Sequence, residues 1–327
     1  MTSEASILPQ VKLGRDGPTI GAQGLGCMGM SEFYGETHEG EARATLDRAL
    51  ELRVTMFDTA DMYGLGANES FLGPFFRAHR DRVLIATKFG YRRDVSNPND
   101  WSLDNHPDYI RAAAERSLKR LGIETIDLYY MHRRSGEVPL EDSIGAMADL
   151  VTAGKVRHLG LSEVSAKELQ AAHAIHPITA LQSEWSLFTR QIEEAVVPIA
   201  AELGIAIVPY APLGRGLLTG KLHPEALPQG DARTNFPRFA RDNATANQAL
   251  IAKIQSLAES RGVTAPQLAL AWLHDRARVH GVTVVPIPGT RKIERLEENL
   301  SATALTLSKR ELDALEPIAA AVQGAAI

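Results

Sequence analysis

The chain has 327 residues, 44% of them hydrophobic, and a formal net charge of −5. This length allows a large core, and the acidic balance argues against the basic surface that nucleic-acid binding needs. The single cysteine, Cys27, excludes an intramolecular disulfide and a cysteine-based metal cluster, and we expect no metal site. No apolar run approaches the roughly 20 residues that span a bilayer, and residues 1–5 lack the basic start of a signal peptide. We therefore expect a soluble, cytoplasmic protein that binds neither membranes nor nucleic acids.

Taken in chain order, the residues predict a hairpin and then a regular alternation of strands and helices. Asp16-Gly17 is a strong turn signal between two short strands in residues 11–20. Runs of apolar and β-branched residues predict strands at 23–26, 54–57, 82–88, 126–131, 156–161, 180–181, 205–209 and 282–285. Apolar residues at helical spacing predict helices at 39–51, 68–77, 108–121, 140–153, 166–174, 192–203, 248–260, 266–275, 293–300 and 308–322. A long segment rich in glycine and proline, residues 211–243, is expected to be irregular.

Eight strands, each followed by helix, indicate a parallel sheet with helices outside it. Eight such units close a (β/α)8 barrel, so the predicted fold class is α/β: a TIM barrel with an N-terminal β-hairpin and a C-terminal extra helix. A doubly wound fold is the alternative, because Gly24-Leu-Gly26-Cys-Met-Gly29 matches the glycine pattern of a dinucleotide-binding turn. No helix is predicted directly after this turn, so we prefer the barrel, as one domain over residues 1–327.

Polar residues stand at or just past several predicted strand ends, where a barrel places its active site. Asp58 and Tyr63 follow the second strand, Lys88 ends the third and His132 follows the fourth. A lysine ammonium lowers the pKa of a neighbouring tyrosine, and a carboxylate keeps that lysine charged. Such a tyrosine can protonate an alkoxide while a histidine orients the carbonyl oxygen, as carbonyl reduction by hydride requires. Each residue alone also suits a structural role, as a helix cap, a packed ring or a solvated strand end.

Several motifs occur in order along the chain: Phe57-Asp-Thr-Ala-Asp-Met-Tyr63-Gly64, Ala86-Thr-Lys88, Tyr129-Tyr-Met-His132-Arg133, Leu161-Ser162-Glu163, Leu181-Gln182-Ser183, Pro209-Tyr210-Ala-Pro-Leu-Gly214-Arg215-Gly216 and Pro286-Ile-Pro-Gly-Thr-Arg291. With them the chain resembles the aldo-keto reductase family over nearly its whole length. The resemblance is greatest to the bacterial and plant branch that includes perakine-reductase-like and auxin-induced-type enzymes. It implies NAD(P)H-dependent reduction of an aldehyde or ketone substrate, with Asp58, Tyr63, Lys88 and His132 as the catalytic residues.

The expected cofactor is NADPH. Residues 288–299 form a loop that runs into a helix N-terminus, and such a terminus binds phosphate through free backbone N–H groups. Arg291, Lys292 and Arg295 add positive charge there, which favours the 2′-phosphate of NADPH. Alternatively, these cations form ion pairs with the glutamates of the same helix, Glu294, Glu297 and Glu298.

A second cofactor segment is the glycine-punctuated loop 212–221, which can cover a pyrophosphate with its backbone N–H groups. The resemblance implies that this loop is a lid, that Tyr210 stacks on the nicotinamide, and that Ser162 and Gln182 bond its carboxamide. The complete set of expected cofactor residues is Met28, Ser162, Gln182, Tyr210, Leu213, Gly214, Arg215, Gly216, Lys221, Gly289, Thr290, Arg291, Arg295, Glu298 and Asn299.

Two segments depart from the family pattern. Glu163 follows Ser162 where many members have asparagine, and an ionised glutamate accepts hydrogen bonds but cannot donate them. Arg133-Arg134 places positive charge after the histidine, and we hypothesise that it favours substrates with an anionic group.

Aromatic residues near the mouth suit aromatic or apolar carbonyl compounds. The expected substrate residues are Tyr34, Tyr91 and Trp185.

Two other functions compete with the reductase. Potassium-channel β-subunits resemble the same family and keep the four residues, so the chain could instead be an NADPH-binding regulatory subunit that senses redox state with little turnover. A metal-dependent barrel hydrolase or lyase would need clustered histidine and carboxylate ligands at the strand ends. His132 is the only histidine at such a position, which ranks this alternative last.

Overall fold

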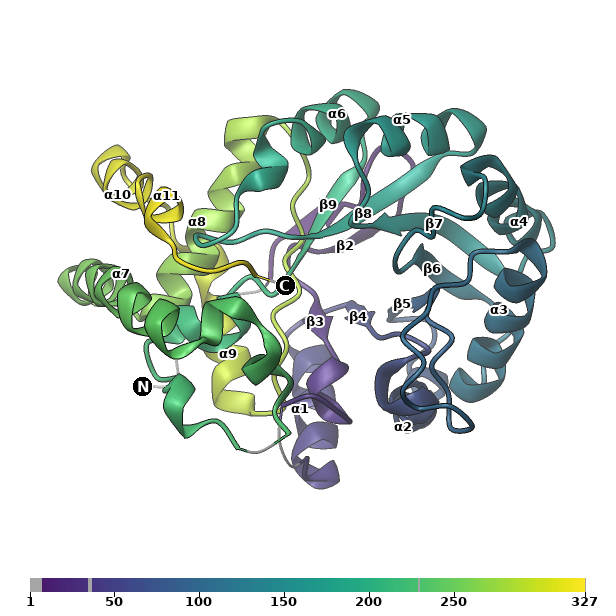
Figure 1. The fold of residues 1–327 in the computed structure, drawn as a ribbon, viewed down its shortest axis with the longest axis horizontal. Coiled ribbons are helices and arrows are strands. Elements are labelled where there is room, and N and C mark those ends of the chain that lie inside the picture. Colours follow the sequence, from purple (N-terminus) through teal and green to yellow (C-terminus); the bar gives the residue numbers. More distant parts are fainter. Residues whose placement is uncertain (1–7, 35–36, 229, 327) are drawn as a thin grey trace.

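The computed structural model describes residues 8–34, 37–228 and 230–326, so the expectation about residues 1–5 lies outside the described residues. Seven parallel strands run in chain order from β3 to β9 and curve into a nearly closed barrel, with helices on its outer face (Figure 1). The strands are β3 (Leu25–Gly26), β4 (Met56–Asp58), β5 (Leu84–Phe89), β6 (Ile126–Met131), β7 (Val156–Ser162), β8 (Ile178–Glu184) and β9 (Ala206–Tyr210).

The eighth position of the barrel is filled by an extended segment, residues 282–289, and not by the regular strand predicted at 282–285. Isolated bridges join this segment to β9 and to β3, pairing Val284 with Ile207 and Gly289 with Gly26. Pro286 and Pro288 have no N–H to donate, so a continuous ladder of hydrogen bonds cannot form. The segment still closes the ring between β9 and β3, and the predicted (β/α)8 architecture is confirmed.

The predicted N-terminal hairpin is confirmed, and it covers the amino end of the barrel. Its strands, β1 (Gln10–Lys12) and β2 (Thr19–Gly21), pair antiparallel. Leu13 and Ile20 are buried in the same apolar cluster as side chains of β4, β5, β6, β8 and β9. Gly14 has φ +70°, and a side chain there would lie 2.5 Å from the carbonyl oxygen of Thr179 at the start of β8, so glycine is required. The carboxyl ends of the strands remain as the open end.

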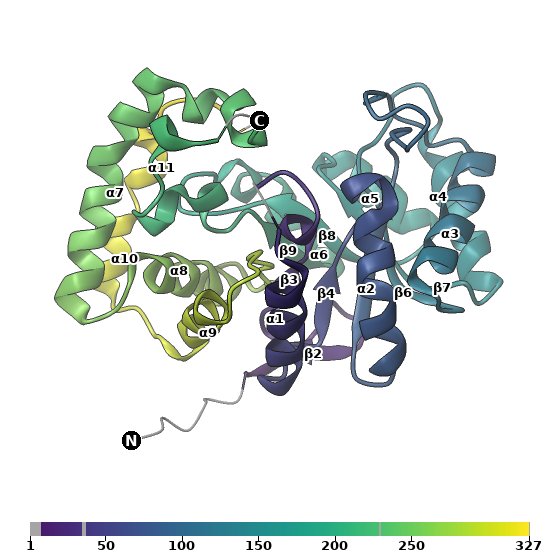
Figure 2. The ribbon, with the colours of Figure 1, turned by 90° about the horizontal axis from the view of Figure 1, so that it is seen from below.

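Eight helices follow the barrel positions: α1 (Glu39–Glu51), α2 (Ala67–Ala78), α3 (Pro107–Leu121), α4 (Leu140–Thr152), α5 (Ala166–Ile175), α6 (Val196–Leu203), α8 (Ala265–His280) and α9 (Ile293–Ser301). Three more, α7 (Arg241–Arg261), α10 (Lys309–Leu315) and α11 (Ile318–Ala321), lie on the side of α8, as Figures 1 and 2 show. Capping boxes begin α5, α8 and α10, at Ser165, Thr264 and Ser308.

Four helix predictions need correction. Helix α6 begins at Val196 rather than at 192, because Glu193 lies in a separate 3-10 turn. Helix α7 begins at Arg241 rather than at 248, since its first turns contain no large apolar residue to mark the period. Helix α8 continues past 275 to His280 through charged residues. The predicted terminal helix at 308–322 is two helices, because Pro317 cannot donate the hydrogen bond that would continue the first one.

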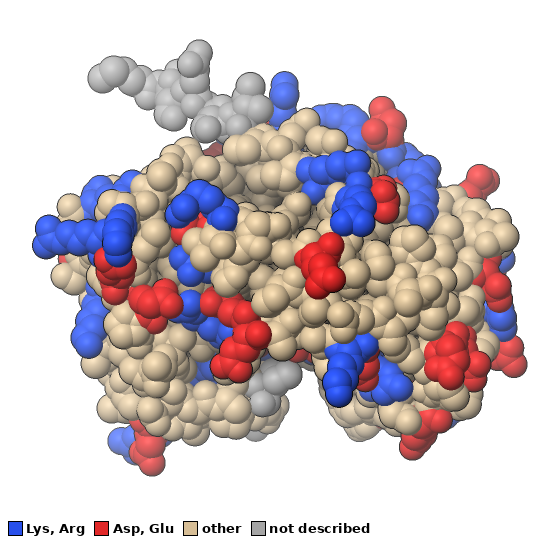
Figure 3. All heavy atoms as spheres, turned by 90° about the horizontal axis from the view of Figure 1, so that it is seen from above, with Lys and Arg blue, Asp and Glu red and all other residues tan. Residues whose placement is uncertain are grey.

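Charges of both signs are distributed over the surface. On the face shown in Figure 3, the basic and acidic side chains are interspersed and do not form a large field of one sign. No helix in the described ranges is both long and apolar enough to cross a membrane. No group of three or more His, Cys, Asp or Glu residues within those ranges could hold a metal ion.

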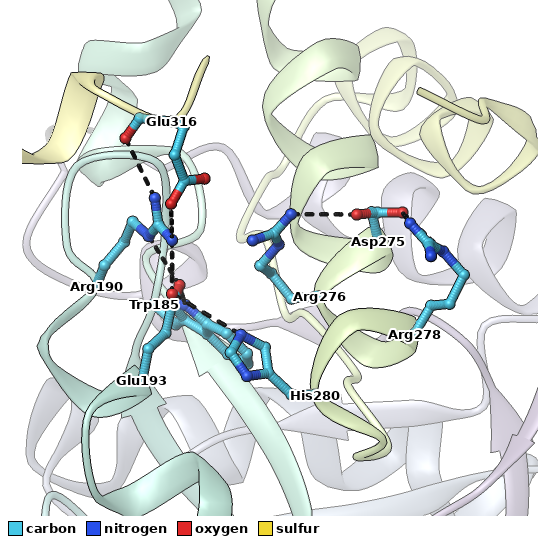
Figure 4. A network of polar contacts seen from close by, with 8 residues as sticks. All are labelled: Trp185, Arg190, Glu193, Asp275, Arg276, Arg278, His280 and Glu316. Atoms are coloured by element: carbon cyan, nitrogen blue, oxygen red, sulfur yellow. Dashed lines mark hydrogen bonds and ion pairs between the residues drawn. The ribbon is translucent and has the colours of Figure 1, made fainter. Parts of the chain in front are cut away.

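Glu193 anchors a polar network in the segment that follows β8 (Figure 4). Its carboxylate accepts hydrogen bonds from the indole N–H of Trp185 at 2.9 Å and from Nη2 of Arg190 at 2.7 Å. Arg190 also pairs with Glu316 at 2.8 Å, which fastens the end of α10 to the barrel. Trp185, predicted to contact the substrate, has no exposed surface and its N–H is bonded here. The structure therefore places Trp185 in the core.

Replacing Glu193 with alanine removes the acceptor of both donors and leaves the Arg190 guanidinium, only 17% exposed, without its nearest carboxylate. Because the buried indole N–H of Trp185 loses its acceptor and Arg190 keeps only Glu316, we expect the free energy of unfolding to fall by about 2 kcal/mol. Urea denaturation measures the change. The matched control is Arg111→Ala, which breaks an exposed pair with Asp149 and should change that free energy by less than about 0.5 kcal/mol. Equal effects of the two substitutions would contradict the prediction.

Candidate active site

The four predicted catalytic side chains converge at the carboxyl end of the strands. Asp58 is the last residue of β4, Lys88 lies near the end of β5, His132 follows β6, and Tyr63 begins a 3-10 turn after β4. All four are buried. Asp58 pairs with Ala86 in the parallel register of β4 and β5. Lys88 is two residues further on, so its side chain points to the same face and reaches Asp58.

Lys88 is the centre of the cluster. Its ammonium donates to Oδ1 of Asp58, to the carbonyl oxygen of Thr59 at 2.7 Å and to the hydroxyl of Tyr63 at 3.4 Å. Burial by itself lowers the pKa of a lysine, but the contacts with Asp58 and Tyr63 together outweigh burial here, and the pKa of Lys88 is raised. The side-chain amide of Gln182 donates to the other oxygen of Asp58 at 2.7 Å and holds the carboxylate. Lys88 is therefore charged and within reach of the tyrosine.

Tyr63 and His132 are both neutral. Burial raises the pKa of Tyr63, and Lys88 opposes this rise without reversing it, so the net shift is opposite to the fall expected from the sequence. The hydroxyl therefore keeps its proton at neutral pH. Burial, with Lys88 and Arg133, lowers the pKa of His132 well below its usual value. The two rings meet edge-on with 5.9 Å between their centres, so a phenol and a neutral imidazole border the same space.

Arg133 lies beside two of the residues expected to contact the nicotinamide, Ser162 and Tyr210. Its Nη1 donates to Oγ of Ser162 at 3.0 Å, and its guanidinium carbon lies 6.0 Å from the ring centre of Tyr210. Arg134 is held elsewhere, since it pairs with Glu168 of α5 at 3.1 Å. Any preference for anionic substrates would therefore come from Arg133, and the hypothesis for Arg134 is not supported.

Glu163, the departure from the family pattern, ties two strand ends together. It has φ +53°, a left-handed conformation that is unusual for a residue with a side chain. Its N–H donates to the carbonyl oxygen of Gln182 at 3.1 Å, and its carboxylate accepts the backbone N–H of Glu184 at 2.7 Å. The carboxylate thus has a structural partner at the end of β8.

The loop after β9 carries five of the expected cofactor residues, and part of it, Gly214–Thr219, is a 3-10 turn. The guanidinium of Arg215 lies 3.7 Å from Glu184, donates to the hydroxyl of Tyr34 at 3.3 Å and packs 4.4 Å from the ring centre of Phe236. Tyr34, predicted to contact the substrate, therefore contacts this loop. Of the other expected members, Gly214 is buried, Leu213 and Gly216 are half-buried, and Lys221 is exposed.

The predicted phosphate-binding cations divide into two groups. Arg291 donates to the carbonyl oxygens of Gly29 at 3.0 Å and Tyr34 at 3.1 Å, so it holds the loop 29–34. Lys292 and Arg295 are exposed at the start of α9. In the described part of the chain these cations make no ion pair within 4 Å with the glutamates of α9; one of those glutamates, Glu297, pairs instead with Arg48 of α1 at 2.7 Å.

The remaining expected cofactor residues surround this helix start. Gly289 and Thr290 precede α9, while Glu298 and Asn299 lie within it, and Asn299 is buried. Met28 lies in a 3-10 turn just after β3. The bridge between Gly26 of β3 and Gly289 brings this turn close to the segment that precedes α9.

Aromatic rings surround Tyr63 and His132. Tyr91 meets His132 edge-on with 5.2 Å between ring centres, and Trp101 meets Tyr91 at 6.0 Å. Phe33 lies 6.3 Å from Tyr63, also edge-on. Of the three expected substrate residues, Tyr91 is the one that the structure brings to the predicted catalytic groups.

Three charged residues at the site were not singled out from the sequence: Glu32, Arg93 and Glu184. Glu184 stands at a strand end, which is the one local signal among them. Glu32 and Arg93 are ordinary charged loop residues in the sequence, and only their neighbours in space distinguish them.

Two carboxyl groups are buried beside the loop that carries Tyr63. Glu69 accepts hydrogen bonds from Thr87 at 2.6 Å and from Arg120 at 2.7 Å. Asp61 has no partner for its Oδ1 among the described residues. Burial, with Glu69 nearby, raises the pKa of Asp61 to about 8. Asp61 is therefore a neutral acid at pH 7, close in the chain to Tyr63.

Asp61 makes the stability pH-dependent. Its pKa of about 8 in the folded state exceeds the ordinary value of 3.8, so between these values the folded state keeps a proton that the unfolded state releases. The free energy of unfolding should therefore fall as the pH rises from about 4 to about 8. Asp61→Asn should lose this part of the dependence and be more stable than the wild type near pH 8. Urea denaturation across this range measures both proteins, and parallel pH curves would contradict the assignment.

These features define a class of protein: a (β/α)8 barrel whose acid–base site combines a buried aspartate, lysine and tyrosine with a neutral histidine. Residues 23–320 match the model of the Aldo/keto reductase family. The chain belongs to this family, as its sequence motifs predicted, and it is an oxidoreductase.

Known relatives cover nearly the whole chain. It is 44% identical over 312 residues to probable aldo-keto reductase 1 of Glycine max, covering 95% of this chain and 88% of the relative. It is also 44% identical over 307 residues to aldo-keto reductase yakc of Schizosaccharomyces pombe, whose name specifies NADP(+), covering 92% and 88%. The assignment to one branch of the family stays a prediction.

Solved structures share the fold. The glycerol dehydrogenase of Gluconobacter oxydans is similar with a TM-score of 0.83 and 28% identity, covering 98% of this chain and 97% of that one. The holo form of an aldo-keto reductase from Bacillus halodurans is similar with a TM-score of 0.77 and 27% identity, covering 95% and 96%.

Proposed function

We propose that the protein uses NADPH to reduce a small aldehyde or ketone to the alcohol, with Tyr63 as the general acid. The observation that carries this proposal is the Lys88 ammonium, buried between the Asp58 carboxylate and the Tyr63 hydroxyl and beside the neutral His132. This arrangement supplies a proton donor and an oxygen-orienting donor at one point, which is what protonation of a forming alkoxide requires.

NADPH, when bound, supplies a hydride from nicotinamide C4 to the carbonyl carbon. The residues of the chain act on the oxygen. His132 donates an N–H to the carbonyl oxygen and orients it. As negative charge develops on that oxygen, Tyr63 transfers its hydroxyl proton to it, and the Lys88 ammonium, 3.4 Å away, stabilises the phenolate that remains. Asp58 keeps Lys88 charged and in place. The products are the alcohol and NADP+, and solvent returns the proton to Tyr63.

The residues near β9 and α9 fit such a cofactor. The hydroxyl of Tyr210 and Nε of Arg215 are buried without a hydrogen-bond partner in the described ranges, as expected where a ligand supplies one. The N-terminus of α9 has no side-chain cap, and exposed Lys292 and Arg295 stand beside it. Tyr210 would stack on the nicotinamide, Arg215 would contact the pyrophosphate, and the two exposed cations would contact the 2′-phosphate. The name of the S. pombe relative supports NADPH over NADH.

The aromatic rings of Tyr91, Phe33 and Trp101 favour an aromatic or apolar carbonyl substrate.

The described residues would act as one catalytic domain, because the site draws on loops from β3 through α9.

Tyr63→Phe tests the acid role, because it removes the proton and keeps the ring. With NADPH and 4-nitrobenzaldehyde, turnover should fall at least about 100-fold, while the NADPH dissociation constant stays within about twofold of the wild type. Fluorescence titration with NADPH measures the binding. Retained turnover would contradict the acid role. If the wild type binds NADPH tightly but turns over no carbonyl in a panel, the result would contradict the reductase and favour the redox-sensing regulatory subunit.

A double substitution, Lys292→Ala with Arg295→Ala, tests the phosphate site. Loss of charge-assisted contacts should raise the dissociation constant of NADPH about tenfold or more and leave that of NADH unchanged. Arg291 is left intact, because it holds the loop 29–34. Lys309→Ala, which removes an exposed cation on α10, is the matched control. An equal loss of affinity for both nucleotides would place the 2′-phosphate elsewhere.

A further inference from the structure

The loop that carries the proposed general acid is strained. Gly64, Leu65 and Gly66 follow Tyr63 with φ values of +56°, +57° and +90°. A left-handed backbone costs a residue with a side chain, such as Leu65, about 1–2 kcal/mol. Such a conformation persists only where the surrounding contacts hold it. The position of the Tyr63 hydroxyl therefore depends on what holds this loop.

Glu32 and Arg93 hold the loop on both sides of the tyrosine. The carboxylate of Glu32 accepts the N–H of Gly64 at 2.8 Å, and Nη1 of Arg93 donates to the carbonyl oxygen of Met62 at 3.3 Å. The two side chains bond each other through contacts of 2.9 Å and 2.5 Å. Only 10% of the Arg93 side chain and 24% of the Glu32 side chain are exposed. This pair is bidentate and mostly buried, so its geometry is better defined than that of an exposed ion pair.

The same arginine contacts the aromatic wall. Its guanidinium carbon lies 4.6 Å from the ring centre of Trp101 and 5.8 Å from that of Phe33. Phe33 in turn meets Tyr63 edge-on. Three loops, those after β3, β4 and β5, thus meet at this pair. Neither side chain makes a hydrogen bond, ion pair or cation–π contact with a residue expected to bind NADPH, as far as the described ranges show.

We propose that Glu32 and Arg93 are positioning residues for carbonyl reduction, which fix the peptide groups on either side of Tyr63 and thereby aim its hydroxyl. The inference rests on the proposed function, because the position of the Tyr63 hydroxyl affects the rate only if Tyr63 transfers the proton. Displacement of a reacting group by about 1 Å can lower a rate about 100-fold. The pair therefore acts on kcat, while the affinity for NADPH is independent of it.

Glu32→Ala and Arg93→Met test the proposal in steady-state kinetics with NADPH and 4-nitrobenzaldehyde. Measured well below the thermal midpoint of each variant, kcat should fall about 10- to 100-fold, with the NADPH dissociation constant near the wild-type value. Glu32→Gln keeps an acceptor for Gly64 and should recover part of kcat. Arg261→Met is the matched control, because Arg261 also bonds one carboxylate, that of Glu311, through two contacts of 2.5 Å. An unchanged kcat in Arg93→Met, or an equal loss in Arg261→Met, would overturn the proposal.

Hydrogen exchange separates this proposal from the proposed function. The Gly64 amide should exchange at least about tenfold faster in Glu32→Ala than in the wild type, whether or not the protein turns over a carbonyl. Arg261→Met should leave that amide unchanged. Unchanged exchange at Gly64 in Glu32→Ala would overturn the positioning role even in an active reductase. Faster exchange in a protein without turnover would support the hold on the loop and disprove only the reductase.

Discussion

The site depends on one constraint, a lysine ammonium with no exposed surface. A charge removed from water is tolerated only where partners replace the water, and Asp58, the carbonyl of Thr59 and the hydroxyl of Tyr63 are the partners of Lys88. The parallel pairing of β4 and β5 brings these groups to the same end of the barrel. The contacts that stabilise the buried charge also place it beside the tyrosine, so the stability of the fold and the chemistry of the site rest on the same bonds.

Around this centre, arginines fasten the loops at the open end of the barrel. Arg93 joins the loops after β3, β4 and β5, Arg291 holds the loop 29–34 from the segment before α9, and Arg215 joins the loop after β9 to Glu184. The planar guanidinium suits this role, because its five donors can reach several acceptors in fixed directions. The loops therefore form a connected rim at the open end of the barrel.

The architecture could be predicted because its signal is local and repeated. Eight βα units, the hairpin and the polar residues at the strand ends all follow from periodicity and turn residues. The errors fall where the local signal is weak or is overridden. Prolines break the ladder at 282–289, polar first turns hide the start of α7, and Pro317 divides the terminal helix. The sequence did not show that Trp185 is buried, because an aromatic residue after a strand end can face either the core or the site.

The sequence by itself determined the order of the elements, the family and the residues that stand at the strand ends, because these depend on neighbours in the chain. Only the tertiary structure decided which charged side chains pair and that the Tyr63 hydroxyl keeps its proton. Glu32 and Arg93 are 61 positions apart, and Arg291 and Gly29 are 262 apart, joined by loops that follow no periodic pattern. The pKa of Tyr63 likewise depends on how deeply the barrel buries it, and burial is a property of the packed molecule.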